Sequence, residues 1–364
     1  MKYEIPLLPI SFDLETKSIL KKLAHAHRAL AELKGVTGII PNQSILIDTL
    51  LLQEAKESSE IENIITTHDE LYKYSAILKD SASKSVKEVH NYAAALRRGY
   101  DKVKESSLLT NNLILEIQAV IEENSAGFRK LPGTELINEQ TGQVVYSPPQ
   151  DGQVIKELMA NLEKFINDES LSSLDSLTKM AIIHHQFESI HPFYDGNGRT
   201  GRIINVLYLV KNGLLDTPVL YLSRSINKKK SEYYRLLQSV RKNKNSWEEW
   251  VLFILDAVIE TSFHTISLIQ KMRDLMLHHK NHIREKLPKI YSQDLLNNLF
   301  RHPYTKVDFV TSELRIHRNT ARKYLDELLG IGIVSKYKIG KDSFYINTEL
   351  FELLKNSGPF DRNG

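Results

Sequence analysis

The sequence predicts an all-α protein with more than one domain. Along most of the chain, apolar residues recur every three to four positions, which places them on one face of a helix. Only two segments, near 134–149 and 335–347, instead combine turn-forming residues with short runs of β-branched and aromatic residues, as in a β-hairpin. The length of 364 residues is enough for two or three hydrophobic cores.

Composition narrows the class of protein. Hydrophobic residues make up 41% and charged residues 26% of the chain, as in soluble globular proteins. The lack of cysteine excludes disulfides, thiolate metal sites and cysteine nucleophiles, and the net charge of +3 is too small to indicate a partner. Because we find neither an apolar run of transmembrane length nor a signal-peptide pattern, we expect a cytoplasmic protein with no membrane contact.

The N-terminal half is predicted to be mostly helical. One helix should run over 17–34 and end at the glycines that follow, and a second should begin after Asn42 and continue into the segment 54–64. Four further helices are predicted at 84–100, 110–123, 154–167 and 172–190. The first hairpin lies among them, with turn residues at Asn138 and Gly142.

Twelve residues, HPFYDGNGRTGR, then interrupt the helical pattern. Pro192 has no backbone donor and ends the preceding helix, which leaves His191 at the helix end. Gly196 and Gly198 permit backbone dihedrals closed to other residues, so that N–H groups around Asn197 can point into one concavity. A concavity of this kind suits an anion.

The next helix, expected at 199–212, strengthens this interpretation. Its N-terminus adds the positive end of a helix dipole, and Arg199 and Arg202 lie one turn apart on the same side. Asp195 offers a hard oxygen ligand for a magnesium ion that keeps most of its waters. His191 offers a base that titrates near neutrality. Together these residues predict a site for nucleotide phosphates.

Each of these residues also has an ordinary structural explanation. A histidine before a proline is often a helix cap, an Asp-Gly pair a turn, and two arginines a solvated face. Their concentration within one short segment favours the functional interpretation. The P-loop pattern GxxxxGK[ST] is absent, and the glycines do not follow a predicted strand.

The segment resembles the signature of the Fic family, HPFx[D/E]GNGRxxR, and matches it at every fixed position. Most members of that family transfer AMP from ATP to a hydroxyl of a target protein, within an all-helical domain. The resemblance implies that His191 deprotonates the hydroxyl and that Asp195 holds magnesium against the α- and β-phosphates. The remaining motif residues would bind phosphate: Gly196, Asn197 and Gly198 as the anion hole, and Arg199 and Arg202 on the phosphate tail, with Arg202 nearest the γ-phosphate.

The resemblance extends upstream of this motif. Ser58, Glu62 and Asn63 match [S/T]xxxE[G/N], the inhibitory helix motif of Fic proteins, at the place found in the class inhibited from its own N-terminal side. The alternative is that Glu62 is one more exposed helix glutamate. The hairpin at 134–149 likewise resembles the Fic flap in its position and YxPP ending. Such a flap pairs with target backbone, although an ordinary surface hairpin remains the alternative.

Other polar and aromatic residues near the motif invite functional roles. His184 and His185 do not combine with His191 into a known helical zinc pattern, so we interpret them as packed core residues. An adenine needs an apolar slot and can stack on an aromatic ring. The resemblance places the base after the motif, near residues that core packing also explains: Tyr221, Tyr233 and Tyr234.

Beyond a helix from Lys229, a long apolar helix or two in succession over 247–287 should close the core and then serve as a linker. The C-terminal order of helices and a hairpin resembles a winged helix-turn-helix, with Asn319–Leu329 as recognition helix and Gly340 to Asp342 as wing tip. From 301 to 341 there are nine Lys or Arg against four Asp or Glu. DNA binding is one interpretation, and protein binding or dimerisation is the other.

The sequence therefore predicts four regions: an N-terminal helical region with the inhibitory helix (1–85), a Fic catalytic core (86–270), a helical linker (271–290) and a winged helix-turn-helix (291–364). The predicted function is transfer of AMP from MgATP to a Ser, Thr or Tyr hydroxyl of a target protein, autoinhibited by Glu62. Removal of AMP, transfer of another phosphate-linked group, and a DNA-binding regulator with a nucleotide-sensing core are the alternatives. A homodimer is compatible with the sequence, which does not set the oligomeric state.

Overall fold

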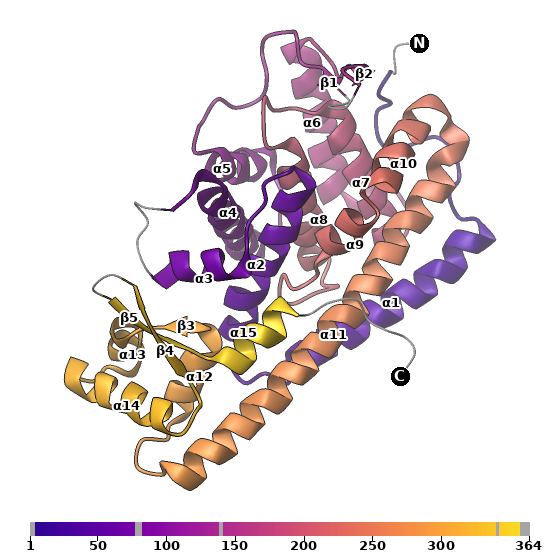
Figure 1. Cartoon of the computed structure of the whole chain (residues 1–364). Helices are drawn as coiled ribbons and strands as arrows, with labels where there is room; N and C mark the ends of the chain where they lie inside the picture. Colours follow the sequence, from indigo (N-terminus) through magenta and orange to yellow (C-terminus); the bar gives the residue numbers. More distant parts are fainter. Residues whose placement is uncertain (1–3, 77–81, 138–140, 340–341, 357–364) are drawn as a thin grey trace.

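The computed structural model describes residues 4–76, 82–137, 141–339 and 342–356. These residues fold into α-helices with one two-stranded and one three-stranded antiparallel sheet, so the predicted all-α class is confirmed (Figure 1). The helices of the first 242 residues are α1 (Lys17–Thr37), α2 (Gln43–Ile61), α3 (His68–Ala76), α4 (Lys84–Ser106), α5 (Asn111–Glu122), α6 (Gly152–Asn167), α7 (Ser176–Ile190), α8 (Asn197–Lys211), α9 (Leu222–Lys228) and α10 (Lys230–Lys242). The remaining elements are β1 (Leu136–Ile137), β2 (Val144–Tyr146), α11 (Trp247–Lys286), α12 (Gln293–Arg301), β3 (Tyr304–Thr305), α13 (Val307–Leu314), α14 (Arg318–Gly330), β4 (Ser335–Ile339), β5 (Asp342–Ile346) and α15 (Thr348–Lys355).

Helices α7 and α8 form the centre of the fold. Every residue of α7 after Ser176 is buried, and α8 is buried from Asn197 to Val210 apart from Gly198. A helix that is covered on all sides must be packed by neighbours all round, and α4, α5, α6 and α11 do so here. The loop between α7 and α8 carries the HPFYDG segment, so the core holds both ends of this loop in place.

The longest helix, α11, is one continuous helix of 40 residues. Helix α1 packs along part of α11 (Figure 1). Lys22 Nζ binds Asp256 Oδ1 at 2.6 Å, and the Thr16 hydroxyl donates to Glu248 Oε1 at 2.9 Å. Helix α11 crosses the predicted core–linker boundary at residue 270 without a break. The predicted domain boundaries therefore stay a prediction.

Helix α11 corrects the expectation that no segment of the chain has the apolar length of a transmembrane helix. The helical stretch Lys244–Lys286 is long and apolar enough to cross a membrane by length and composition. Within its most apolar window, 61% of the residues are buried inside the protein, as in a helix that serves a protein core. Length and composition alone therefore fit a core helix as well as a spanning one.

Three helices were not predicted: α3, α9 and α15. They contain nine, seven and eight residues, which is too short for a clear helical period to appear in the sequence. Isolated helices of this length are marginal, so tertiary contacts supply their stability. In α15, for example, Leu350, Phe351 and Leu354 are buried.

The C-terminal region contains α12, α13, α14 and a sheet with strand order β3-β5-β4. The predicted order of helices and a hairpin is present, and α14 occupies the predicted recognition position. Gly340 and Lys341 of the predicted wing tip lie outside the described residues, as does Asn138 of the first hairpin. The region packs on the N-terminal helices, because Arg301 binds Asp48 of α2 and Gln53 Nε2 donates to the Leu354 carbonyl at 3.3 Å.

A carboxylate is buried where α2 meets α4 and α9. Glu54 is 1% exposed and accepts hydrogen bonds from the Tyr92 hydroxyl at 3.1 Å and the Ser223 backbone N–H at 3.3 Å, and it also contacts the Ser223 hydroxyl. Burial raises the pKa of Glu54 from 4.5 to about 7. The helix that carries Glu62 is therefore anchored through a group that titrates near neutral pH.

This shift predicts a pH-dependent stability. Because the pKa of Glu54 is higher in the folded than in the unfolded protein, its contribution falls as pH rises from about 5 to 8, by roughly 3 kcal/mol. We expect Glu54→Gln, which keeps the shape without the charge, to raise the free energy of unfolding at pH 8 and to change it little at pH 5. Urea denaturation at both pH values measures this difference. The control is Glu105→Gln, an exposed carboxylate on α4; an equal effect of Glu54→Gln at both pH values would contradict the prediction.

Candidate active site

The loop between α7 and α8 is held in a tight turn. His191 ends α7 with a left-handed φ of 48°, and its N–H donates to the Phe187 carbonyl at 2.9 Å. Gly196, with a φ of 78°, leads into α8. The Asn197 side chain closes the loop, because Oδ1 accepts from the Phe193 N–H and Nδ2 donates to the Phe193 carbonyl, both at 2.8 Å. Its amide is thus used inside the loop, which leaves backbone N–H groups at the start of α8 for an anion.

His191 has the electrostatic environment of a base. Burial, and after it the nearby guanidinium groups of Arg129 and Arg241, lower the pKa of its ring to about 3. The imidazole is therefore neutral near pH 7 and has a lone pair that can accept a proton. A bound nucleoside triphosphate would bring negative charge close to the ring, and this charge would favour the protonated form of His191 after the ring accepts a proton.

Arg129 holds the backbone of His191 in place, and the sequence did not indicate this role. It is 1% exposed, its Nε donates to the His191 carbonyl at 2.8 Å, and its Nη2 donates to the Pro149 carbonyl at 2.9 Å. Its own N–H donates to the Pro192 carbonyl at 2.8 Å. One buried guanidinium therefore links the base-bearing loop to the end of the first hairpin.

A cleft of about 520 Å³ opens in front of this loop. His191, Asp195 and Arg199 line it together with the backbone of Gly196 to Gly198. Glu62, at the end of α2, lines the same cleft from the other side, and Leu136 of the hairpin also contacts it. Most of the residues predicted for phosphate, magnesium and inhibition thus lie around one polar cavity.

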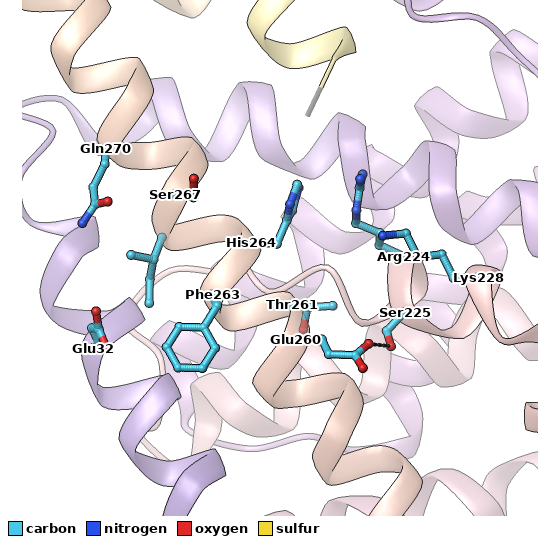
Figure 2. Close-up of a pocket in the computed structure, with 11 residues that line it drawn as sticks. Glu32, Arg224, Ser225, Lys228, Glu260, Thr261, Phe263, His264, Ser267 and Gln270 are labelled. Carbon is cyan, nitrogen blue, oxygen red and sulfur yellow. Dashed lines mark hydrogen bonds between the residues drawn. The ribbon is translucent and has the colours of Figure 1, made fainter. Parts of the chain in front are cut away.

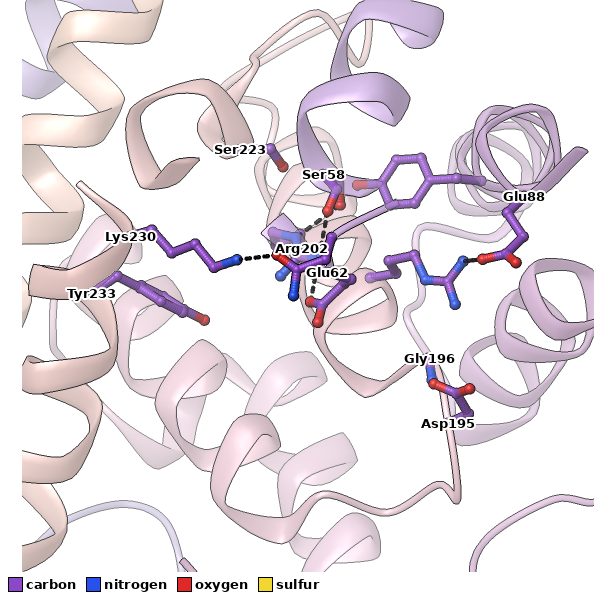
Figure 3. A network of polar contacts seen from close by, with 12 residues as sticks. Ser58, Glu62, Glu88, Asp195, Gly196, Arg202, Ser223, Lys230 and Tyr233 are labelled. Carbon is purple, nitrogen blue, oxygen red and sulfur yellow. Dashed lines mark hydrogen bonds and ion pairs between the residues drawn. The ribbon is translucent and has the colours of Figure 1, made fainter. Parts of the chain in front are cut away.

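Glu62 and Arg202 form an ion pair although 140 positions separate them. Arg202 is 1% exposed, and its Nη2 donates to Glu62 Oε1 at 2.8 Å. Ser58 completes the contact: its hydroxyl accepts from Arg202 Nε at 2.8 Å and its carbonyl accepts from Nη2 at 2.9 Å (Figure 3). Two of the three residues predicted as the inhibitory motif are therefore bound directly to the arginine predicted for the γ-phosphate.

Gly198 makes this approach of Glu62 possible. A Cβ atom at this position would lie 2.2 Å from Glu62 Oε1 and 3.0 Å from Arg202 Nη1. No other residue type would leave room for the carboxylate at this distance. The third motif residue, Asn63, has a left-handed φ of 61° and accepts from Lys230 Nζ at 3.0 Å, which ties the end of α2 to α10.

Arg199 is also held by carboxylates, which the sequence did not indicate. Its Nη1 donates to Glu88 of α4 at 3.1 Å and its Nη2 donates to Glu122 of α5 at 2.7 Å. Arg199 is 4% exposed. A Cβ on Gly196 would come within 2.5 Å of Glu122 Oε1, so this carboxylate lies against the loop itself. In this state both motif arginines are neutralised by acids of the same chain.

The three tyrosines predicted near the adenine do not line the cleft. Tyr221 is 3% exposed and lies near Glu54 and Tyr72. Its burial, and after it the charges of Tyr72 and Glu54, raise the pKa of its hydroxyl well above the usual value. Tyr233 is 1% exposed, and its hydroxyl contacts His184 Nε2 at 2.8 Å. Tyr234 is 42% exposed and packs edge-on against Tyr233. Core packing thus accounts for Tyr221, while Tyr233 lies near Arg202 and Glu62 (Figure 3).

The predicted core role of the neighbouring histidines is confirmed. His184 and His185 are both 0% exposed and pack against Trp250. Burial lowers the pKa of each ring, so both are neutral core residues near pH 7. Among the residues that the structure describes, no cluster of three His, Asp or Glu side chains is arranged to hold a metal.

Asp195 nevertheless fits the role of a single magnesium ligand. Its Oδ1 accepts from the Gly196 N–H at 2.7 Å, which orients the carboxylate, and the side chain is exposed to the cleft. Magnesium in nucleotide sites takes one or two carboxylates, substrate phosphates and several waters, so a three-residue cage is not required.

The first hairpin reaches the cleft through Leu136. Strands β1 and β2 pair antiparallel, and the register shifts between Leu136 and Ile137. Tyr146 anchors the hairpin, because its hydroxyl donates to the Ser189 carbonyl at 2.7 Å and Arg241 lies 3.7 Å from the centre of its ring. Three apolar side chains of the hairpin remain exposed: Ile137, Val144 and Val145.

Two family models match the segments that form this site. The model of the Fic/DOC family N-terminal region matches residues 20–101, and that of the Fic/DOC family matches residues 108–209. Together they cover more than half of the chain and include both motifs. The chain belongs to the Fic/DOC family. The model of the C-terminal domain of protein adenylyltransferase SoFic-like proteins matches residues 275–350 of this Fic protein.

Two curated relatives illustrate the extent of the similarity. The Fic chain is 32% identical over 174 residues to a protein of Aquifex aeolicus named probable protein adenylyltransferase, which covers 47% of this chain and 51% of that protein. It is 30% identical over 131 residues to the protein adenylyltransferase Fic of Drosophila erecta, which covers 36% of this chain and 25% of that protein. The matches thus span about half of the first relative and a quarter of the second.

Solved structures share the fold. A Fic family protein from Desulfovibrio desulfuricans has a TM-score of 0.56 at 20% identity, over 93% of this chain and 97% of that one. A Fic domain containing signaling protein from Bacteroides thetaiotaomicron has a TM-score of 0.55 at 18% identity, over 69% of this chain and 97% of that one. These similarities show the architecture and carry no residue roles.

Three site residues were missed by the sequence: Arg129, Glu88 and Glu122. Each lies in a segment with an ordinary helical or loop pattern, and none belongs to a motif with a fixed spacing to His191. A faint signal was available for Arg129, which sits just ahead of the hairpin in FRKLPG. The two glutamates become visible only when α4 and α5 pack against α8.

Proposed function

We propose that this Fic protein transfers AMP from MgATP to a Ser, Thr or Tyr hydroxyl of a target protein, and that Glu62 holds it in an inhibited state. The observation that carries the proposal is the neutral His191 ring at one cleft with the backbone of Gly196 to Gly198 and the carboxylate of Asp195. This combines a proton acceptor, an anion concavity and an oxygen ligand. The names of the relatives from Aquifex aeolicus and Drosophila erecta support the same activity.

The proposed reaction balances as follows. The hydroxyl oxygen of the target attacks the α-phosphorus, a new P–O bond forms, and the bond to the β-phosphate oxygen breaks. The hydroxyl proton passes to His191, and pyrophosphate leaves. Backbone N–H groups of the loop would stabilise the charge on the phosphate oxygens, because such donors are already oriented before the reaction.

Magnesium is part of this proposal. Asp195 would hold the ion, which would neutralise phosphate charge and support the departure of pyrophosphate. The hydrogen bond from the Gly196 N–H orients this carboxylate in the structure without a nucleotide.

The hairpin suggests how a target would be held. An extended target segment can add to an exposed strand edge through main-chain hydrogen bonds, with little demand on its sequence. The exposed side chains of Ile137, Val144 and Val145 offer apolar contact beside that edge. The hairpin lies at the cleft through Leu136, so a segment bound there would present its hydroxyl near His191.

Intact-mass spectrometry after incubation with MgATP tests the reaction. We expect the chain, or an added target protein, to gain the mass of one AMP. A gain of one phosphate would instead indicate a kinase. Loss of AMP from a previously modified protein would favour removal of AMP, the main alternative within the family, and transfer of another group would give a different mass.

A second proposal concerns the C-terminal region, in which α14 would contact DNA. Arg318, Asn319, Arg322 and Lys323 are exposed along one side of this helix. Several of the basic side chains are already paired with acids, since Arg318 binds Asp308 and Lys336 binds Asp326 at 2.9 Å. The positive surface is therefore modest, and a protein contact or a homodimer remains the competing proposal.

The salt dependence of binding separates these proposals. If Arg322 and Lys323 contact phosphates, a plot of log affinity against log salt should have a slope near −0.9 per contact, and each charge removal should flatten it by about one contact. Fluorescence anisotropy with duplexes of mixed sequence measures the slope for Arg322→Gln and Lys323→Gln. Lys242→Gln on α10 is the control. Absence of DNA binding at low salt would favour the protein contact.

The cytoplasmic location expected from the sequence stays a prediction.

A further inference from the structure

A second cavity, separate from the active-site cleft, lies between α1, α9 and α11 (Figure 2). Its volume is about 710 Å³, which is large enough for a small metabolite. Arg224 and Lys228 of α9 and His264 of α11 contribute nitrogen groups, and Ser225, Thr261 and Ser267 contribute hydroxyls. Figure 2 shows His264 beside Arg224 and Lys228, while Glu32 and Gln270 lie on the other side of the cavity.

Two of the three nitrogen groups of this cavity, those of Lys228 and His264, form no ion pair with an acid among the described residues, whereas Arg224 pairs with Glu57. Within the described part of the chain, Lys228 makes no ion pair and the His264 ring makes no hydrogen bond, although Glu57 and Glu260 lie near Lys228. Burial, and after it the nearby charges of Arg224 and Lys228, lower the pKa of His264 to about 3. The ring is therefore neutral near pH 7 and stands close to two cations. Of the two lining acids, Glu260 is bound by Lys229 at 2.6 Å and by the Ser225 hydroxyl at 2.8 Å. An entering anion would meet a positive and hydrogen-bonding wall.

This cavity is connected to the inhibitory helix through Arg224. Its Nη1 lies 3.4 Å from Glu57 Oε1, and Asn227 Nδ2 donates to Glu57 Oε2 at 3.1 Å. Glu57 directly precedes Ser58, which holds Arg202. The same guanidinium therefore lines the cavity and holds the turn of α2 that places Ser58 and Glu62 on Arg202.

We propose that this cavity binds a small phosphorylated metabolite, and that the bound phosphate competes with Glu57 for Arg224 and loosens the end of α2. A phosphate offers several strong acceptor oxygens and at least one full charge, which matches Arg224, Lys228 and the neutral N–H of His264 better than the single carboxylate of Glu57 does. Loosening of α2 weakens the contacts of Ser58 and Glu62 with Arg202. This second step rests on the proposed function only for its effect on AMP transfer, because the binding and the loosening can be measured without it.

Binding is tested with inorganic phosphate and the full chain by isothermal titration calorimetry. Lys228→Gln and His264→Gln should each weaken the phosphate affinity assigned to this cavity about tenfold, the effect of losing one good charge-assisted hydrogen bond. The matched controls are Lys242→Gln on α10 and His25→Gln on α1, which lie outside both cavities. Equal phosphate affinity in the wild type and in both cavity variants overturns the proposal.

Loosening of α2 is tested by hydrogen exchange of peptides that cover residues 54–64. Phosphate should speed exchange there in the wild type and not in Lys228→Gln, and Glu57→Gln should speed it without phosphate. Binding without faster exchange would overturn the link to α2. Inhibition by Glu62 then adds a third readout: phosphate should raise AMP incorporation in the wild type and leave Glu62→Gly, which is already released, unchanged.

These arms separate the two proposals. If neither the wild type nor Glu62→Gly incorporates AMP, the proposed function fails, while calorimetry and hydrogen exchange still decide the fate of the cavity. If Glu62→Gly incorporates AMP and phosphate neither binds the cavity nor changes exchange, the cavity proposal fails alone.

Discussion

Replacing Glu62 by glycine should raise AMP incorporation from MgATP on the order of 100-fold. In this structure Glu62 Oε1 lies 2.8 Å from Arg202 Nη2, where a phosphate oxygen would otherwise bind. On the proposed mechanism, ATP would still enter with the carboxylate in place, but its phosphate tail would not reach Arg202 and the α-phosphorus would be misaligned with the hydroxyl. A misplacement of about 1 Å is enough for a 100-fold loss in rate, so inhibition acts through geometry more than through affinity.

The measurement is incorporation of labelled AMP by the wild type, Glu62→Gly and the double variant Glu62→Gly/Arg202→Ala under identical conditions. The double variant should lose the gain, because the arginine released by the first change is missing. Glu60→Gly is the matched control, since Glu60 sits at the same end of α2 and pairs only with Lys56 at 3.0 Å among the described residues. Equal incorporation by the wild type and Glu62→Gly would leave Glu62 an ordinary surface residue.

Replacing His191 by alanine should lower AMP transfer by a factor of 10² to 10⁴ or more, because both the general base and its positioning are lost. The experiment is best made in the Glu62→Gly background, where the signal is larger. ATP binding, measured by calorimetry, should survive, since the backbone of Gly196 to Gly198 and Arg202 remain. His25→Ala on the exposed face of α1 is the control. A rate close to that of the parent variant would remove His191 from the mechanism.

The pKa of His191 adds a pH signature to this prediction. The histidine must be neutral to accept the proton, and its pKa of about 3 in the free protein keeps it neutral at every pH above roughly 4. The pH profile of kcat/KM, which reports the free enzyme, should therefore show no loss between pH 8 and pH 5 that is due to His191. A profile that falls with a midpoint near 6.5 would show that the ring is more solvated than the structure indicates.

The sequence alone determined the features that depend on a few neighbouring residues. The helical period of a segment, a proline that ends a helix and a glycine before the next helix all act through backbone dihedrals and local hydrogen bonds. For this reason the loop between α7 and α8 could be predicted from the sequence as an anion concavity. The same holds for α2 and the hairpin. Short helices such as α3, α9 and α15 escaped prediction, because their stability comes from packing rather than from a repeating pattern.

Tertiary structure alone decided the partners of the charged side chains. The family motif suggested that Glu62 is inhibitory, but no local pattern indicates that Glu88 and Glu122 hold Arg199, or that Arg129 bonds the carbonyl of His191. Tyr221 was assigned to the adenine from its place in the chain, whereas packing buries it beside Glu54. The reason is physical: a dihedral preference is set within a few residues, while the partner of a buried charge depends on which helices pack together and at what angle, and a low-dielectric interior makes that choice of partner costly to change.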